Sequence, residues 1–256
     1  MPVLKSLAVV GAALTLTASL HAQTTVWTNG GNNSEWSDPA NWSAGVPNAS
    51  SLVQIGTQPT DNIVGLETGL ITNVIAGFTF NDTLTASISV LAAGVENLTV
   101  AGAINNSSNF AHSFELPVFA AANATYHAGQ GLTFNSLIVG TNTIGVTGSL
   151  TVTDTLVLDL TSAASYGTIG SIDVTGATIN IGGLYTGNVG DTFDLTTGSF
   201  AGATIGVLPT LSEGLSWDTS QFLSQGILTV VPEPAVLALL SLGTAAIIFG
   251  KRRRRG

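Results

Sequence analysis

Between Gln23 and Val231 the chain contains no lysine and no arginine, which limits what this region can fold into and what it can bind. All 6 basic residues lie in the end segments, whereas Glu233 is the only one of the 15 acidic residues outside the region. The region therefore carries 14 acidic side chains and a formal charge of −14. Without ion pairs to Lys or Arg, its stability must come from buried apolar surface and backbone hydrogen bonds.

The same charge distribution excludes whole classes of partner. A body without basic side chains has nothing to neutralise phosphates, so we expect no nucleic-acid binding. Polyanionic sugars and anionic lipid headgroups are disfavoured for the same reason. The chain also lacks cysteine, but its roughly 209 residues between the end segments are enough to bury a core without disulfides.

The N-terminus has the pattern of a secretory signal peptide. Lys5 precedes an apolar run over residues 7–20, and Leu20-His21-Ala22 ends it with a small residue at the cleavage position. We predict a signal peptide over residues 1–22. A retained membrane anchor is the alternative, but the run is short for a spanning helix.

The C-terminus combines a Pro-Glu-Pro motif, an uncharged apolar stretch and a basic cluster. The 16 residues 235–250 would form a helix of about 24 Å, slightly less than the roughly 30 Å of a bilayer core, so local thinning or snorkelling would make up the difference. Basic residues favour the cytoplasmic side, which leaves the preceding chain outside. We predict a tail over residues 231–256, with a transmembrane helix at 235–250. Its motif residues are Pro232, Glu233 and Pro234, and its basic cluster is Lys251, Arg252, Arg253, Arg254 and Arg255.

The intervening body, residues 23–230, has the alternation of apolar and polar residues that half-buried strands require. Examples are Leu98-Thr99-Val100, Leu150-Thr151-Val152 and Ile179-Asn180-Ile181. An all-β fold follows, and short repeated strands in a low-charge chain favour a right-handed parallel β-helix, a solenoid of about eight rungs. A β-sandwich is the alternative, because periodicity alone does not separate the two. The aromatic and Ala-rich stretch 111–131 interrupts this texture and is expected to be a short helix or an insertion loop.

The tail resembles the PEP-CTERM sorting signal of exported bacterial proteins. That resemblance implies recognition by an exosortase-like membrane protease and transpeptidase, with cleavage near Pro232-Glu233-Pro234. The segment 27–47 and the segment 166–230 are similar to the opening and closing parts of autotransporter-associated, β-helix-like proteins that often carry this tail. The residues that carry the first part of this second resemblance are Trp27-Thr28-Asn29-Gly30-Gly31, Trp36, Asn41-Trp42, Gly45 and Pro47. Those that carry the closing part are Tyr166, Ile172, Gly190-Asp191-Thr192-Phe193, Leu208-Pro209, Leu215-Ser216-Trp217-Asp218 and Gly226-Ile227-Leu228-Thr229-Val230.

Three tryptophans near the start of the body have two interpretations. Trp27, Trp36 and Trp42 form either an aromatic platform for sugar rings or a cap over the first rung of the solenoid, and capping is favoured.

Catalytic and metal-binding motifs find little support in the sequence. His112 and Glu115 have a metal-like spacing, but no H-E-x-x-H or cysteine set accompanies them. The carboxylate pairs Asp191 with Asp194 and Asp154 with Asp159 are the candidates for glycoside hydrolysis. We expect no enzyme activity, no cofactor and no dedicated metal site, with loosely bound calcium as the one exception.

These observations together predict an exported, non-enzymatic structural or adhesive protein of the cell envelope or extracellular matrix. It would be anchored in the inner membrane as a precursor, processed by an exosortase-like enzyme, and moved to the cell surface, where it would contact extracellular polysaccharide. The alternative is a secreted glycoside hydrolase or polysaccharide-binding protein on a β-helix scaffold.

Overall fold

The computed structural model describes residues 22–67, 74–92 and 96–233, which form two long parallel β-sheets and a small antiparallel sheet. The first long sheet contains, in spatial order, β1 (Gln23–Trp27), β2 (Ser51–Ile55), β5 (Gly77–Phe80), β8 (Ile104–Asn106), β10 (Ala124–His127), β12 (Thr143–Thr147) and β15 (Thr168–Ile169). The second contains β18 (Thr204–Ile205), β16 (Thr178–Gly182), β13 (Leu150–Ser162), β11 (Leu132–Gly140), β9 (His112–Ala120), β6 (Ser89–Ala92) and β3 (Ile63–Leu66). Beside this path lie β4 (Val74–Ile75), β7 (Leu98–Val100) and β14 (Ser165–Tyr166).

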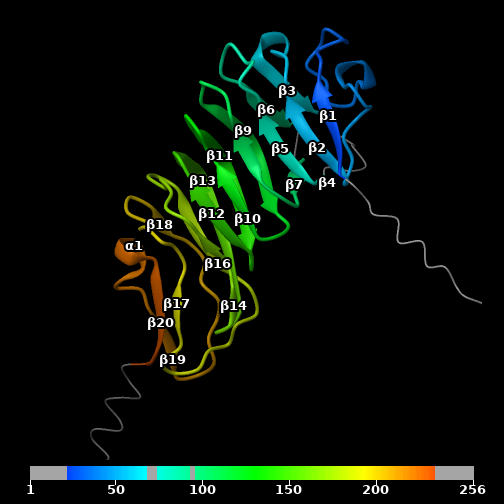
Figure 1. Ribbon diagram of the computed structural model, residues 1–256. Coiled ribbons are helices and arrows are strands. Elements are labelled where there is room, and N and C mark those ends of the chain that lie inside the picture. Colours follow the sequence, from blue (N-terminus) through cyan, green and yellow to red (C-terminus); the bar gives the residue numbers. More distant parts are fainter. Residues whose placement is uncertain (1–21, 68–73, 93–95, 234–256) are drawn as a thin grey trace, which may run out of the picture.

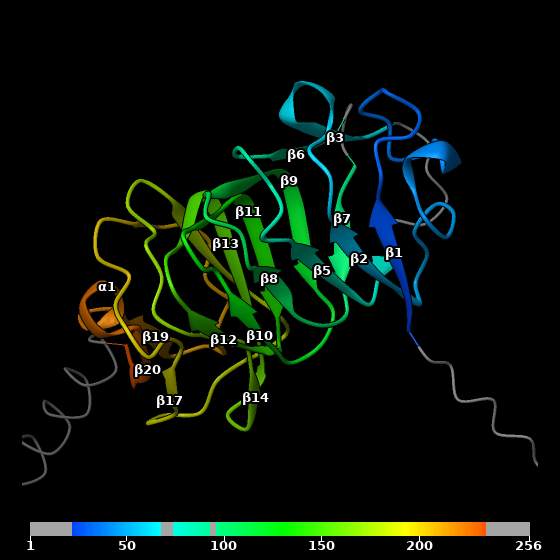
Figure 2. The ribbon, with the colours of Figure 1, turned by 45° about the horizontal axis from the view of Figure 1, so that its top comes forward.

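The chain alternates between the two long sheets and winds into a β-solenoid of about 6 turns (Figures 1 and 2). Strands stack in parallel, and the chain returns to the same place after 18 residues between Leu132 and Leu150 and after 28 between Gln23 and Ser51. The prediction of an all-β solenoid is confirmed, and the β-sandwich alternative is wrong because the sheets are parallel. The right-handed sense of winding stays a prediction.

The expected eight rungs are too many because both ends of the body are used for closing the solenoid instead of extending it. At the N-terminal end, residues 28–50 form a loop with the short 3-10 helix η1 (Pro39–Asn41). A second 3-10 helix, η2 (Thr60–Asn62), precedes β3. At the C-terminal end, β17 (Thr192–Asp194), β20 (Ile227–Pro232) and β19 (Leu215–Asp218) form the antiparallel sheet, in that spatial order. Helix α1 (Phe222–Gln225) lies just before β20.

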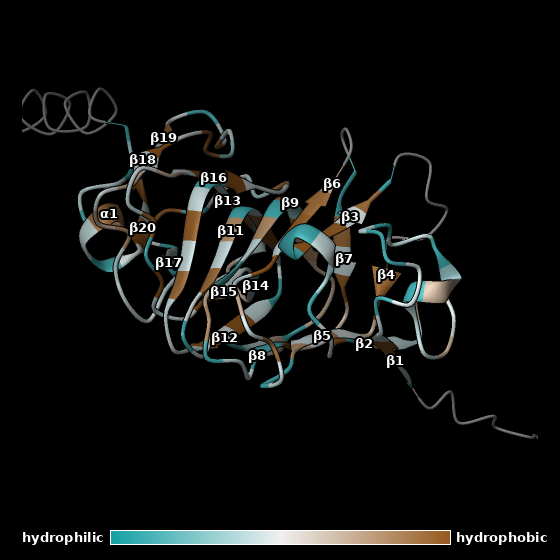
Figure 3. Cartoon of the chain, turned by 90° about the horizontal axis from the view of Figure 1, so that it is seen from above, coloured by the Kyte–Doolittle hydropathy of each residue, from teal (hydrophilic) through white to brown (hydrophobic). Residues whose placement is uncertain are grey.

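Hydrophobic and hydrophilic residues alternate along strands such as β9 and β11 (Figure 3), and buried positions alternate with exposed or half-buried ones in the same way. One set of side chains therefore points into the solenoid and the other points outward. Inside, aliphatic residues occupy successive levels of one ladder; they are Leu98, Val118, Leu137, Leu156, Ile179 and Ile205. Aromatic residues stack in the same way, as the parallel rings of Phe114 and Phe134 do at a centroid distance of 5.0 Å. These ladders supply the burial that must stabilise a body without Lys or Arg ion pairs.

Gly183 shows how closely adjacent levels approach. Its φ is +92°, and a Cβ atom there would lie 2.1 Å from the backbone oxygen of Leu160 in the preceding turn. Both the positive φ and the contact require glycine at this corner. Gly176 has a similar φ of +85°, but a Cβ atom there would meet nothing within 4 Å.

The expectation of a helix or insertion loop at residues 111–131 is wrong. This segment contains strands β9 and β10, which continue both sheets of the solenoid. His112, Phe114, Leu116 and Val118 all point into the core. The alternation is therefore regular, and the high alanine content of the stretch concealed it.

Of the predicted signal peptide, only Ala22 lies within the described residues. The predicted helix 235–250 and the basic cluster 251–255 lie outside them. Within the part of the chain that the structure describes, no helix is long and apolar enough to cross a membrane.

Candidate functional site

The three tryptophans predicted as a cap or a sugar platform lie together at the N-terminal end of the solenoid. Trp27, Trp36 and Trp42 are 0%, 1% and 5% exposed. The ring of Trp42 lies edge-on to both others, at centroid distances of 5.0 Å from Trp27 and 4.9 Å from Trp36, and its Nε1 donates a hydrogen bond of 2.7 Å to the Trp36 oxygen. No ring of the three offers an open face. The geometry therefore supports capping, and contact of these rings with carbohydrate stays a prediction.

The edges of both sheets are also covered at this end. The backbone of Thr28 bonds to Asn41, and Ser43 bonds to Val26, so the loop pairs along β1. The amide of Trp36 bonds to Gly65 of β3 at 2.8 Å. Covered edges prevent another strand from adding to the sheet.

The Pro-Glu-Pro motif begins inside the fold. Pro232 is the last residue of β20 and pairs with Leu215 of β19, and the amide of Glu233 donates a hydrogen bond of 2.9 Å to the oxygen of Gly214. Because proline has no amide hydrogen, its place at the end of a strand is favourable. Pro234 lies outside the described residues. The predicted processing motif thus follows the folded body without a linker.

A row of polar side chains runs along the outer face of the first sheet, one from each of five levels. Its members, which we call the outer polar row, are Gln54, Thr79, Asn105, His127 and Thr147. Two of the four neighbouring pairs share a hydrogen bond: His127 Nδ1 lies 2.8 Å from the Thr147 hydroxyl, and the Asn105 amide donates to the Thr79 hydroxyl at 3.5 Å. Levels of a parallel sheet are about 4.8 Å apart, so the row presents donors and acceptors at regular intervals.

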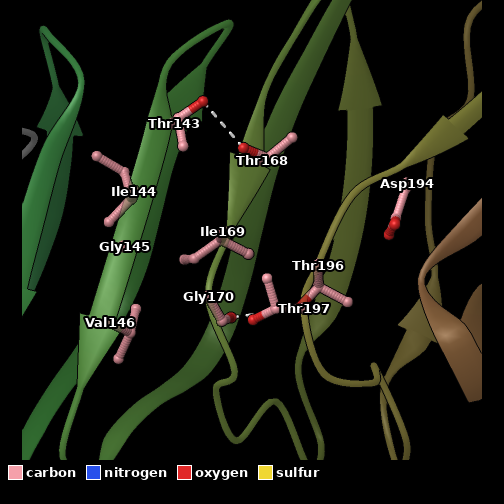
Figure 4. Close-up of a pocket in the computed structure, with 10 residues that line it drawn as sticks. All are labelled: Thr143, Ile144, Gly145, Val146, Thr168, Ile169, Gly170, Asp194, Thr196 and Thr197. Carbon is pink, nitrogen blue, oxygen red and sulfur yellow. Dashed lines mark hydrogen bonds between the residues drawn. The ribbon is translucent and has the colours of Figure 1, made fainter.

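A groove of about 420 Å³ continues this sheet toward its C-terminal end (Figure 4). It crosses three levels: β12, β15 and the segment 194–197. Its lining combines Gly145 and Gly170 with apolar side chains, those of Ile144, Val146 and Ile169. Thr143 and Thr168 also line it, and the Thr168 hydroxyl donates a hydrogen bond of 3.0 Å to the Thr143 hydroxyl. The threonine hydroxyls can hydrogen-bond an uncharged ligand, and the apolar side chains can pack against its carbon atoms.

One carboxylate, that of Asp194, lines this groove. Its predicted partner, Asp191, accepts hydrogen bonds from the Tyr185 hydroxyl and, at 3.2 Å, from the Asn188 side chain. The bond from Tyr185, followed by that from Asn188, lowers the pKa of Asp191, which favours a permanently ionised carboxylate. Asp191 therefore has a structural role in holding the loop 185–191, and it is not among the groove residues.

The second predicted pair, Asp154 and Asp159, lies on strand β13 of the other sheet. Asp154 accepts a hydrogen bond of 3.3 Å from Ser136. Asp159 lies beside Gly182 of the next level, where a Cβ atom would be 2.3 Å from its Oδ1. Neither carboxylate lines the groove of the first sheet.

Sequence reasoning missed a buried polar network around His112, which is 2% exposed. The amide of Ile88 donates to His112 Nδ1 at 3.0 Å, which assigns the ring hydrogen to Nε2, and Nε2 lies 2.5 Å from the Ser108 hydroxyl. That hydroxyl also bonds to Asn106 Oδ1 at 2.9 Å. The imidazole stacks on the ring of Phe80 at a centroid distance of 4.1 Å.

Burial lowers the pKa of His112 to about 4, so the side chain is neutral at pH 7. His112 points inward on β9, whereas Glu115 points outward. Their spacing in the sequence therefore does not bring them together. Among the described residues, no three His, Asp or Glu side chains form a group that could hold a metal ion.

Comparisons with known proteins bear on the C-terminal tail. Searches of curated proteins and of solved structures found no match to this chain. Residues 230–255 match the family model of the PEP-CTERM protein-sorting motif. This motif is the recognition signal of exosortase. Its presence indicates an exported protein that is anchored in a membrane before processing. The structure and the comparison together therefore show a β-solenoid body followed directly by a PEP-CTERM sorting motif.

Proposed function

We propose that this protein is a non-enzymatic structural or adhesive component of the cell envelope or extracellular matrix. The observation that carries the proposal is the direct junction between a folded β-solenoid and the sorting motif, which begins at the buried residue Val230. In this account, the predicted signal peptide exports the chain, the tail holds it in the inner membrane, and an exosortase-like enzyme releases or transfers the body to the surface. The solenoid is proposed to be right-handed, as parallel strand crossovers are, and related to autotransporter-associated proteins.

Neutral polysaccharide is the surface partner that the chemistry of the body favours. No lysine or arginine lies between positions 23 and 231, so acidic glycans would meet only negative charge. The outer polar row and the neighbouring groove instead offer hydroxyl, amide and imidazole groups. These groups can hydrogen-bond sugar hydroxyls without an opposite charge.

The carboxylate at the groove allows the hydrolase alternative to be tested against the proposed binding surface. Most glycoside hydrolases use two carboxyl groups that flank the scissile bond, and among the described residues one carboxylate, Asp194, lines this groove. If the groove is a binding surface, the wild-type body releases no sugar from glycan. The Asp194→Asn variant should then bind glycan as the wild type does. Glycan cleavage that disappears in Asp194→Asn would establish the hydrolase alternative.

Retention on immobilised glycans tests the proposed contact. We expect the body to be retained on at least one neutral glycan and not on acidic ones. In a double variant, Thr79→Val and Thr147→Val, retention should fall several-fold because two hydroxyls of the outer polar row are lost. Thr133→Val with Thr151→Val is the matched control, since these paired threonines belong to the opposite sheet. If no neutral glycan retains the wild type, the proposed contact is wrong.

A further inference from the structure

The C-terminal end of the solenoid must lie close to the membrane in the anchored precursor. Glu233 is bonded to Gly214 and thus belongs to the folded body, and the apolar stretch of the tail begins at Ala235. A residue spans at most about 3.6 Å, so these two positions are no more than about 7 Å apart. The body therefore has no linker that would let it move away from the bilayer surface.

Two loops at this end carry unusually exposed apolar side chains. The loop 183–190 follows β16 and contains Leu184 and Val189, whose side chains are 92% and 61% exposed. The loop 206–214 follows β18 and contains Val207, which is 68% exposed. These are three of the five large hydrophobic side chains that are exposed within the described residues. Isolated apolar residues are common on protein surfaces, but a cluster at one end indicates an interaction site.

Backbone contacts place these loops next to the strand that leads into the tail. The amide of Gly190 donates a hydrogen bond of 2.9 Å to the oxygen of Val230 in β20. The amide of Ser212 bonds to the Thr186 oxygen at 2.7 Å, so the two loops lie side by side. Figure 1 shows them at the end of the molecule where the chain leaves β20.

We propose that the loops 183–190 and 206–214 rest in the interfacial layer of the bilayer that holds the tail, with Leu184, Val189 and Val207 among the lipid headgroups. This inference rests on the anchored precursor of the proposed function. Glu213 lies in the second loop, and the body offers no Lys or Arg, so zwitterionic headgroups fit and anionic ones do not. Processing of the tail would then release the body by removing the anchor, because three apolar side chains alone hold a protein weakly.

Site-specific labels on the full chain test this contact, and the natural absence of cysteine makes single labels straightforward. Leu184→Cys, Val189→Cys and Val207→Cys would each carry a fluorophore that is sensitive to polarity. Leu52→Cys is the control, because Leu52 is 39% exposed on β2, far along the solenoid from the tail. Each variant is reconstituted into phosphatidylcholine vesicles containing nitroxide-labelled lipid, and flotation shows whether it is anchored. Circular dichroism and a thermal melt show that each remains folded.

We expect nitroxide lipids to quench labels at positions 184, 189 and 207 at least three-fold more than at position 52. Equal quenching at all four positions in floating protein would overturn the inference while leaving the anchored precursor intact. Labels that are shielded from water but not quenched by lipid would also overturn it, since a second copy or the tail would then cover the loops. Failure of the protein to float would instead refute the anchored precursor itself, and this inference with it.

Discussion

Acidification below pH 6.5 should destabilise the body through a single buried side chain, His112. Its pKa falls from an ordinary value of 6.5 to about 4 because burial disfavours the charged imidazolium. Between these values the unfolded chain binds a proton that the folded chain does not, so the free energy of unfolding falls as the pH falls. Each pKa unit corresponds to about 1.4 kcal/mol, which makes the full loss about 3 kcal/mol by pH 4.

Other groups act at lower pH and can be separated from this effect. The pKa values of Asp173, Asp191 and Asp218 are lowered below 3.8, chiefly by hydrogen bonds from Thr175, Tyr185 and Ser220 respectively. Carboxylates of this kind stabilise the folded state above their unfolded pKa and lose that contribution only as the pH falls below it. The interval from pH 6.5 to 4.5 therefore reports mainly on His112.

Urea unfolding of the body, residues 23–233, at pH 7.0, 6.0, 5.0 and 4.5 measures this loss. The wild type should lose about 2 to 3 kcal/mol over the series. His112→Gln should be less stable at pH 7 because it disrupts the network with Ser108, but it should lose much less with falling pH. His127→Gln, at an exposed position, should follow the wild type. The reasoning is refuted if wild type and His112→Gln have the same pH dependence.

Three further substitutions test the packing of the solenoid, each by urea or thermal unfolding. Gly183→Ala should lower the free energy of unfolding by at least 2 kcal/mol more than Gly176→Ala. Both positions have a positive φ, but only at Gly183 would the new Cβ atom meet backbone. Equal losses for the two variants would contradict the close approach between levels. Trp42→Phe should lower the free energy of unfolding by about 1 to 3 kcal/mol, because it leaves the backbone oxygen of Trp36 without its buried donor. An unchanged unfolding midpoint would exclude this hydrogen bond as a stabilising contact. Leu156→Ala should lower the free energy of unfolding by about 2 to 5 kcal/mol, because it opens a cavity in the aliphatic ladder. A loss below 1 kcal/mol would indicate a loosely packed interior.

The strand pattern was readable from the sequence because each strand carries it locally. Leu150-Thr151-Val152 and Ile179-Asn180-Ile181 alternate as the structure shows, with the aliphatic members inside. The stretch 111–131 was misread because its alanines and aromatics suggested a different element, although its alternation is equally regular. Local periodicity was a better guide there than composition.

The outer polar row and the groove could not be predicted in the same way. They depend on which residues of successive turns become neighbours, and the turns differ in length. Asn105 and His127 pair after 22 residues, whereas Thr143 and Thr168 pair after 25. Without a fixed repeat, no spacing in the sequence identifies these neighbours. The His112 network has the same origin, because the Ile88 amide and the Phe80 ring that contact it come from earlier segments of the chain.

The sorting tail was predictable for the opposite reason, since motif, apolar stretch and basic cluster are contiguous.

The measurement that tests the role of the sorting tail most directly is the intact mass and membrane fractionation of the native protein beside a variant with Pro232→Ala, Glu233→Ala and Pro234→Ala. The account predicts that the native protein loses both end segments and leaves the inner membrane, whereas the variant keeps its tail and stays. If both proteins keep the tail and remain in the inner membrane, the tail is only an anchor, and the proposed sorting to the surface is wrong.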